Sequence, residues 1–367
     1  MVMADRPEVA TSSLPVTAIT LYGLGQNLLT GVAGVPFSRP WRGPGNIVEN
    51  LGQAITRHTL RSFMGYSLGL PIDEFRAMEQ VLDGVCRVVM PPIVRQIGGV
   101  KISAKTLGGV PGLWCQQHVT GDDDDRVYGT ILYLHGGGYI GTSPMMYAAF
   151  AAAIARQTRC HFFIADYRLA PEFPFPAGVL DAASVYTALL DQGILPGNLI
   201  VAGDSAGGGL AASLMSHLRA AGIAPPAALA LFSPEVDLEL NQPSITDNAP
   251  YDVLPWNLPT APYLQGIEPG DPLVSTVNAA LNPEWFPPTF VTSGSQEMFR
   301  DGIRKFVVNL RDAGVRVHAV EEEGMFHVFP ILMPWAEASR RVFRQLNEFV
   351  DSHVQSRSYT TQADDTD

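Results

Sequence analysis

The segment GDSAG, residues 203–207, places a single serine, Ser205, among small residues between two apolar runs. The run before it, Leu199 to Ala202, predicts a strand, and the run after it, Leu210 to Ala221, predicts a helix. A G-x-S-x-G sequence in this setting predicts a strained turn that pushes the serine Oγ toward a substrate. Small neighbours are required because strand and helix pass close together there. Glycine-rich turns also serve as plain connectors, so this interpretation depends on chemical partners elsewhere in the chain.

Acyl transfer by a serine requires a base that takes the hydroxyl proton, an acid that orients the base, and N–H donors for the developing oxyanion. Donors are indicated by HGGG, residues 135–138, which directly follows a predicted strand. Successive glycines let backbone N–H groups point at a substrate oxygen, and the N–H of Ala206 supplies the second half of such a site. The alternative is a glycine turn that only links a strand to a helix.

Eight histidines compete for the role of the base. Seven lie in the glycine turn, within predicted strands, in the helix after the serine, or away from loops at the carboxyl edge of the sheet (His135, His161, His318, His217, His58, His118 and His353). His327 remains, in EEEGMFHVFP between a predicted strand and the closing helix, where a loop returns toward the serine. The alternative for His327 is an ordinary buried or surface histidine.

The acid is expected between the serine and the histidine along the chain. Glu297 directly follows the predicted strand 289–294, whose end lies beside the serine turn in a doubly wound sheet. Asp301 is the alternative, but it suits the start of a helix, where a carboxylate interacts favourably with the positive end of the dipole. The run of glutamates at 321–323 is typical of a solvated charged face.

Strand-like and helix-like segments alternate from about residue 100 onward. The predicted strands are 100–107, 113–120, 130–136, 161–167, 199–203, 228–234, 289–294 and 315–320, and the helices lie near 147–156, 179–190, 210–221, 301–313 and 335–350. Repeated alternation of this kind predicts an α/β fold with a mostly parallel sheet covered by helices on both faces.

The remaining segments define the expected domain organisation. We expect a helical N-terminal cap or lid over 1–95, a catalytic domain over 96–352 with a Pro- and Asn-rich, loop-rich insertion at 234–287, and a disordered tail over 353–367. The cap and the insertion are expected to line a substrate pocket with apolar side chains. The acidic run GDDDDR at 121–126 predicts a solvated hairpin tip rather than a metal site.

Two apolar stripes mark the N-terminal region, which carries no charge from Val9 to Ser38. Helical spacing joins Leu21, Leu24, Leu28, Val32 and Val35 in one stripe, and Phe75, Met78, Leu82, Val85 and Val89 in the other. The first stripe predicts packing against the body of the protein. A peripheral contact of residues 16–36 with a membrane surface and a membrane span are the alternatives, and no basic region of a signal peptide precedes the stripe.

Composition excludes some functions. The chain has 367 residues, 46% of them hydrophobic, and a net charge of −12, which argues against a nucleic-acid partner because such partners require basic patches. Three cysteines (Cys86, Cys115 and Cys160), without metal-ligand spacing, predict neither a disulfide framework nor a zinc site. An intracellular, reduced compartment, the cytoplasm with possible membrane association, fits this cysteine usage.

Several motifs in a fixed order carry a resemblance to a known family. From Ile131 to the closing helix these are HGGGYIGT, YRLAPEFPFPA, GDSAGG, SPEVDL, GSQEMFRD and HVF. Together they resemble the hormone-sensitive-lipase-like family of α/β-hydrolases. The resemblance implies an α/β-hydrolase fold with a nucleophile, a base, an acid and oxyanion donors, which are respectively Ser205, His327, Glu297, and Gly136, Gly137 with Ala206. The family usually has aspartate as the acid, so Glu297 departs from its pattern by one methylene.

The resemblance implies a serine carboxylesterase that acts on short- to medium-chain acyl esters through an acyl-enzyme, with no metal or organic cofactor. A transacylase, an amidase or a lactonase would use the same acyl-enzyme. A non-catalytic ligand receptor on the same fold is a further alternative, which the presence of His327 disfavours. Relatives often pair through a sheet edge, so a homodimer is a possible assembly.

Overall fold

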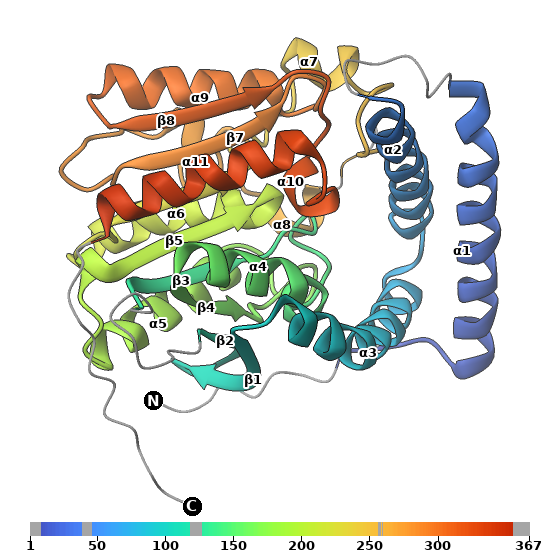
Figure 1. Ribbon diagram of the computed structural model, residues 1–367, viewed down its shortest axis with the longest axis horizontal. Coiled ribbons are helices and arrows are strands. Elements are labelled where there is room, and N and C mark those ends of the chain that lie inside the picture. The colour runs from blue at the N-terminus through green and yellow to red at the C-terminus, as the bar shows by residue number, and fades with distance from the viewer. Residues whose placement is uncertain (1–8, 39–45, 118–126, 256–257, 259, 355–367) are drawn as a thin grey trace, which may run out of the picture.

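The computed structural model describes residues 9–38, 46–117, 127–255, 258 and 260–354 (Figure 1). Its centre is an eight-stranded sheet of order β1-β2-β4-β3-β5-β6-β7-β8. The strands are β1 (Val100–Leu107), β2 (Val110–Gln117), β3 (Gly129–Leu134), β4 (Cys160–Ala165), β5 (Leu199–Asp204), β6 (Ala228–Phe232), β7 (Thr289–Gly294) and β8 (Val317–Glu322). The predicted hairpin tip at 121–126 and residues 355–367 of the predicted tail lie outside the described residues.

Strand direction confirms the predicted sheet. β1 and β2 form an antiparallel ribbon, and β2 pairs antiparallel with β4. The pairs from β4 through β3, β5, β6 and β7 to β8 are all parallel. Parallel strands bring their carboxyl ends to the same edge of the sheet, which is where ligands bind in open α/β sheets. The fold is therefore the expected α/β-hydrolase fold.

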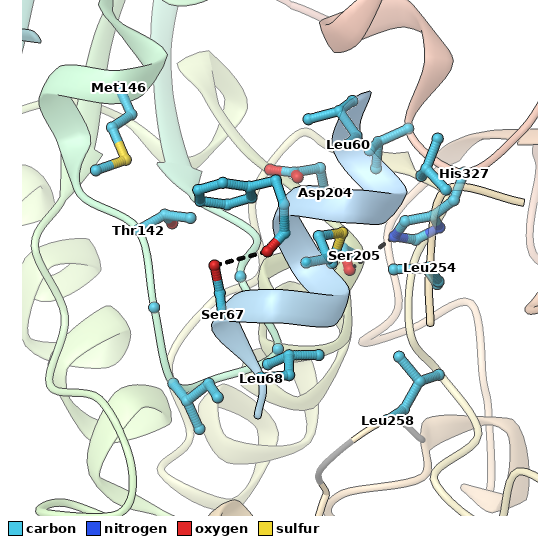
Figure 2. Close-up of a pocket in the computed structure, with 18 of the residues that line it drawn as sticks. Leu60, Ser67, Leu68, Thr142, Met146, Asp204, Ser205, Leu254, Leu258 and His327 are labelled. Atoms are coloured by element: carbon cyan, nitrogen blue, oxygen red, sulfur yellow. Dashed lines mark hydrogen bonds between the residues drawn. The ribbon is translucent and has the colours of Figure 1, made fainter. Parts of the chain in front are cut away.

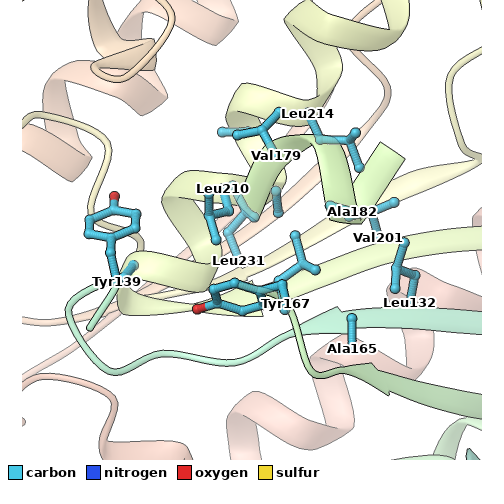
Figure 3. Close-up of a cluster of buried hydrophobic side chains, with 14 of the residues drawn as sticks. Leu132, Tyr139, Ala165, Tyr167, Val179, Ala182, Val201, Leu210, Leu214 and Leu231 are labelled. Carbon is cyan, nitrogen blue, oxygen red and sulfur yellow. The ribbon is translucent and has the colours of Figure 1, made fainter. Parts of the chain in front are cut away.

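Helices cover both faces of this sheet (Figure 1). Contacts place α4 (Ala148–Thr158) and α11 (Glu337–His353) on one face, and α5 (Ala177–Asp191), α6 (Ser205–Ala220) and α9 (Arg300–Asp312) on the other. The alternation of side chains along a strand explains why both faces are apolar: Ile131 and Tyr133 of β3 pack in one core cluster, and Leu132 and Leu134 in the other. Figure 3 shows the cluster that contains Leu132.

Two helix boundaries differ from the sequence prediction. The helix predicted from Leu210 already begins at Ser205 as α6, because three successive glycines, residues 207–209, fit closely packed positions in its first turns. At the C-terminal end, α11 continues through His353, and Val354 is buried. The expected tail therefore begins no earlier than residue 355.

The N-terminal region is helical, as predicted, with α1 (Leu14–Gly34), α2 (Ile47–Ser67) and α3 (Ile72–Ile97). α1 is the outermost of the three and packs on α2 and α3 (Figure 1). Most of its apolar stripe faces inward, since Leu24 and Val35 are buried, although Val32 is exposed. No helix within the described ranges is long and apolar enough to span a bilayer.

The apolar stripe of α3 follows the prediction only over its first half. Phe75 and Met78 are buried, but Val85 and Val89 are exposed. The packed face of α3 continues instead through a different set of side chains, Met90, Val94 and Ile97, which contact the core cluster that includes α4.

Loops and short helices fill the segment 234–287, as expected for an insertion. The short helices of the described chain are α7 (Pro243–Asp247), α8 (Ala261–Leu264) and α10 (Phe329–Leu332), with 3₁₀ turns at η1 (Val35–Ser38), η3 (Pro144–Tyr147), η4 (Pro196–Asn198) and η5 (Thr276–Asn278). The insertion extends from the carboxyl end of β6 to the start of β7, so it leaves the sheet on the edge where ligands bind.

Candidate active site

Ser205 lies on the turn between β5 and α6 with a φ of 52°, a left-handed conformation that is rare for serine. The flanking glycines are required by close approach. A Cβ at Gly207 would overlap the carbonyl oxygens of Leu134 and His135, and one at Gly203 would overlap the carbonyl of Gly207. The prediction that small residues surround the serine because strand and helix are close together is confirmed.

His327 is the histidine that the fold brings to this serine. It lies in the loop between β8 and α10, and its Nε2 is 2.9 Å from Ser205 Oγ (Figure 2). Both side chains are buried, and Phe299 packs edge-on against the imidazole with a centroid distance of 5.0 Å. The ring is therefore held in contact with the serine hydroxyl by packing as well as by the hydrogen bond.

Glu297 lies just beyond the carboxyl end of β7 and is fully buried. Its Oε2 accepts hydrogen bonds from Ser233 Oγ (2.6 Å) and from the N–H of Gly294 (2.9 Å). Its Oε1 is 4.0 Å from His327 Nδ1, and within the described residues neither of these two buried atoms has a hydrogen-bond partner. A contraction of about 1 Å would satisfy both atoms at once.

Asp301, the alternative acid, has a different role. It lies in the first turn of α9, where its carboxylate accepts a hydrogen bond from the N–H of Ser244 (3.0 Å) and pairs with Arg300 (2.9 Å). This agrees with the expectation that Asp301 belongs to a helix start. The acidic run at the end of β8 also forms ion pairs at the surface, Glu321 with Arg304 among them.

The predicted oxyanion donors differ in whether their N–H groups are already hydrogen-bonded. The N–H of Gly136 donates to Asp204 Oδ1 (2.9 Å), which removes it from the donor set. Gly137 and Gly138 line the cavity in front of Ser205, and no described residue accepts a hydrogen bond from their N–H groups. The N–H of Ala206 lies in the first turn of α6, where helix geometry supplies no acceptor. Among the described residues of these two turns, Gly137, Gly138 and Ala206 therefore keep N–H groups that are free to bind an oxygen beside the serine.

Sequence reasoning missed Asp252, a fully buried residue in the insertion. Its Oδ1 accepts a hydrogen bond from the N–H of His327 (2.9 Å), and its Oδ2 accepts one from the N–H of Met298 (2.7 Å). One carboxylate thus ties the loop of the histidine to the loop of Glu297. No motif or periodicity marks Asp252 in the sequence, because its role depends only on where the insertion folds.

The helix α2 was also not expected to contact the catalytic loops. Arg57 Nη2 donates to Gln296 Oε1 (3.1 Å), and its guanidinium lies 5.8 Å from the centroid of the Phe326 ring. Arg61 donates to the carbonyls of Ala249 and Asp252. The contacts of Arg57 hold α2 against the residues that directly precede Glu297 and His327, and those of Arg61 hold it against the insertion.

A cavity lies between the cap and the carboxyl edge of the sheet, with Ser205 and His327 in its wall (Figure 2). It encloses about 1190 Å³, open solvent at its mouth included. Its apolar lining comes from both regions that were expected to supply it, the cap and the insertion. These side chains include Leu60, Phe63, Leu68, Phe75, Met78, Leu254 and Leu258.

The charges around the imidazole favour its protonated form. Burial lowers the pKa of His327, but the carboxylates of Glu297, Asp252 and Asp204 outweigh it and raise the pKa above its usual value. Burial raises the pKa of Asp204 to about 6, against the hydrogen bonds that it accepts. An imidazolium that forms when the histidine takes the serine proton is thus stabilised by several carboxylates.

The cysteines take no part in this arrangement. All three are free thiols, and Cys115 and Cys160 are buried in neighbouring strands of the sheet. Across the described parts of the chain, no three histidine, cysteine, aspartate or glutamate side chains come together as metal ligands would.

Comparison with known proteins places the chain in a family. The profile of the alpha/beta hydrolase fold matches residues 131–331. An acetyl-hydrolase of Streptomyces hygroscopicus is 36% identical over 60% of this chain and 75% of its own length, and an esterase of Acinetobacter venetianus is 32% identical over 75% and 88%. A hormone-sensitive lipase structure from a metagenome library covers 80% of this chain and 99% of its own, with 30% identity and a TM-score of 0.69.

The chain therefore belongs to the α/β-hydrolase family and, within it, to the hormone-sensitive-lipase group. The relative from Acinetobacter venetianus is an esterase, and this activity agrees with a serine and a histidine in direct contact at the carboxyl edge of the sheet.

Proposed function

We propose that this chain is a serine carboxylesterase that hydrolyses short- to medium-chain acyl esters through Ser205, His327 and Glu297. The observation that carries the proposal is the 2.9 Å contact of His327 Nε2 with Ser205 Oγ inside an apolar cavity. A non-catalytic receptor would have no need of a base in contact with a strained serine. The strain of the turn and the free N–H groups beside it support the same proposal.

The proposed reaction begins when His327 takes the hydroxyl proton and Ser205 Oγ attacks the acyl carbon. The oxyanion then accepts hydrogen bonds from the N–H groups of Gly137, Gly138 and Ala206. Collapse of the tetrahedral intermediate transfers the proton from the imidazolium to the leaving alcohol and leaves an acyl-enzyme. Water, deprotonated by the same histidine, releases the carboxylic acid. Each oxyanion donor contributes about 2.7–4 kcal/mol of transition-state stabilisation in comparable sites.

Glu297 orients the imidazole in this mechanism. Its free Oε1 faces His327 Nδ1 across 4.0 Å, while Oε2 is fixed by Ser233 and Gly294. Protonation of the ring makes Nδ1–H a charge-assisted donor, so we expect the gap to close as the reaction proceeds. The glutamate side chain is one methylene longer than aspartate, and its anchored Oε2 keeps that longer arm in place.

The substrate class rests on the cavity. Apolar side chains of the cap and the insertion line a concave cavity beside the serine, which suits a short or medium acyl chain rather than a lipid interface. The acetyl-hydrolase of Streptomyces hygroscopicus, a relative, supports the short end of this range. Rates on nitrophenyl esters from acetate to dodecanoate would locate the preference, and product analysis with an added alcohol would separate hydrolysis from acyl transfer.

Replacement of the nucleophile tests the proposal directly. We expect Ser205→Ala to lower kcat by about 10⁶-fold and to abolish covalent labelling by a fluorophosphonate probe, because no other group attacks the acyl carbon. Mass spectrometry of the labelled wild-type chain should locate the adduct on the peptide that contains residue 205. Labelling that persists in the variant would exclude this assignment.

A further inference from the structure

Three carboxyl side chains line the cavity, Glu79, Asp204 and Glu235, and two of them are fully paired. Asp204 accepts hydrogen bonds from Tyr133 (2.8 Å) and from the N–H of Gly136 (2.9 Å). Glu79 accepts hydrogen bonds from Arg76 on its own helix (2.7 Å) and from the N–H of Thr142 (2.6 Å). These two carboxylates bind the glycine turn and the residues just after it. Both already have protein partners, so neither indicates a ligand.

Glu235 is different. It is only 4% exposed, yet no described residue makes a hydrogen bond with its carboxyl group, which faces the cavity. A carboxyl that is shielded from bulk water and has no protein partner can gain a hydrogen bond, so an unpaired carboxyl in the wall of a cavity indicates a partner that enters with the ligand.

The backbone of Glu235 is fixed to the serine turn. Its N–H donates to the carbonyl of Ser205 (2.9 Å), and its own carbonyl accepts a hydrogen bond from Tyr139 Oη (3.4 Å). The side chain therefore projects from a fixed point beside the nucleophile. The remaining lining is largely apolar, so Glu235 offers a bound molecule an unpaired polar side chain in the cavity that contains the nucleophile.

We propose that Glu235 binds a hydroxyl group carried by the ester substrate a few atoms from the reacting carbonyl. This inference rests on the proposed esterase function and deepens it, because it makes Glu235 a specificity-determining residue that favours hydroxylated esters over plain alkyl esters. An alkyl chain in the same place leaves the carboxyl without a partner, whereas a hydroxyl satisfies it.

A hydroxyl suits this carboxyl in either protonation state. Burial raises the pKa of Glu235 to about 7, although the nearby His327 opposes the rise. Near neutral pH both forms are populated. A hydroxyl donates to the carboxylate and accepts from the carboxylic acid, whereas an amine or an anion would match only one of them.

Two matched substrate pairs test the inference. On the acyl side, nitrophenyl 3-hydroxybutyrate is compared with nitrophenyl butyrate, and on the alcohol side, glycerol monobutyrate is compared with propyl butyrate. For each pair the ratio of the two kcat/KM values is measured in the wild type and in variants. We expect Glu235→Leu to lower the ratio about tenfold in at least one pair, and the pair that responds identifies the side of the ester that carries the hydroxyl.

Matched variants separate a lost contact from a disturbed cavity. Glu235→Gln keeps a donor and an acceptor, so its ratios should stay within about threefold of the wild type. Glu79→Gln alters a carboxyl that is already paired, and it should leave the ratios unchanged whatever it does to the individual rates. If the leucine variant does not fold, Glu235→Met provides the second apolar replacement.

Fluorophosphonate labelling of each variant distinguishes failure of the proposed esterase function from failure of the Glu235 inference. A wild type that is not labelled at Ser205 would overturn the proposed esterase function. A labelled Glu235→Leu variant whose ratios in both pairs equal those of the wild type would overturn the Glu235 inference alone.

Discussion

The neighbouring cap helices α1 and α2 are attached to the molecule in different ways (Figure 1). Polar side chains of α2 reach the loops of the catalytic site, where Gln53 donates to the carbonyl of Gly324 and Arg57 contacts Gln296. The contacts of α1 run to α2 and α3 instead, through Thr20 among others.

Because of this difference, we expect α1 and α2 to have different functions. The sequence predicts one cap or lid over residues 1–95, but α2 is anchored to both of the loops that contain Glu297 and His327. A helix anchored in this way positions catalytic groups, whereas a lid must separate from them. α1 is an outer layer whose exposed face carries large apolar side chains, Ile19, Tyr22 and Leu29 among them. We therefore expect changes in α2 to act on the rate and changes in α1 to act on stability or on surface contacts.

The largest loss of rate is expected from Glu297 itself, which lies in the loop that α2 contacts. We expect Glu297→Gln to lower kcat by about 10³–10⁴-fold, because the imidazole loses the group that orients it. Removal of a negative charge also lowers the raised pKa of His327. The histidine acts as a base only when neutral, so the acidic limb of the kcat/KM profile should move to lower pH. A variant with unchanged kcat would remove Glu297 from the mechanism.

Loss of the α2 contact should have a smaller effect on the same step. Arg57→Met removes the hydrogen bond to Gln296 and the contact with Phe326, which releases the residues beside Glu297 and His327. We expect kcat to fall about 10–100-fold, since small displacements of reacting groups have costs of this size. Arg95→Met, an exposed arginine of α3, is the matched control. Equal rates for the two variants would contradict the positioning role of α2.

The corresponding change in α1 should leave the rate unaffected. Thr20 is buried and donates to Glu74 Oε2 (2.7 Å), so Thr20→Val removes one hydrogen bond between α1 and α3. We expect the free energy of unfolding to fall by about 1–2 kcal/mol, measured in urea, with kcat unchanged. A rate loss like that of Arg57→Met would show that α1 and α2 act as one unit.

The smallest effect concerns the outer face of α1. Exposed apolar side chains within residues 16–36 leave the peripheral membrane contact open to test, and the net charge of −12 favours a neutral surface over an anionic one. We expect the wild type to co-sediment with phosphatidylcholine vesicles and the double change of Ile19→Asp with Leu29→Asp to reduce this binding. Rates on a soluble ester should not change. A wild type that stays in the supernatant would leave α1 with its packing role alone.

Sequence could predict the serine turn because its causes are local. Gly203 and Gly207 fall within two residues of Ser205, and the strand before them is a continuous apolar run. The order of the parallel strands then predicts that the loops after β7 and β8 approach the same edge of the sheet. Both Glu297 and His327 could therefore be selected from their positions along the chain.

The remaining features depend on contacts between distant segments. Whether Gly136 offers a free N–H is decided by Asp204, which is 68 residues away in sequence. The positions of Asp252 and Arg57 follow from how the insertion and α2 fold onto the sheet, and neither lies in a recognisable pattern. Side-chain partners of this kind become visible only once the tertiary structure is known.

The attachment of α2 also affects how truncated fragments and chimeras of this enzyme should be designed. A fragment cut at the family boundaries, residues 131–331, would retain Ser205, Glu297 and His327. It would lack Gln53, Arg57 and Arg61, which brace the last two from outside those limits. Chimeras that exchange cap segments among relatives should therefore be joined ahead of α2, so that the helix travels with the loops it supports.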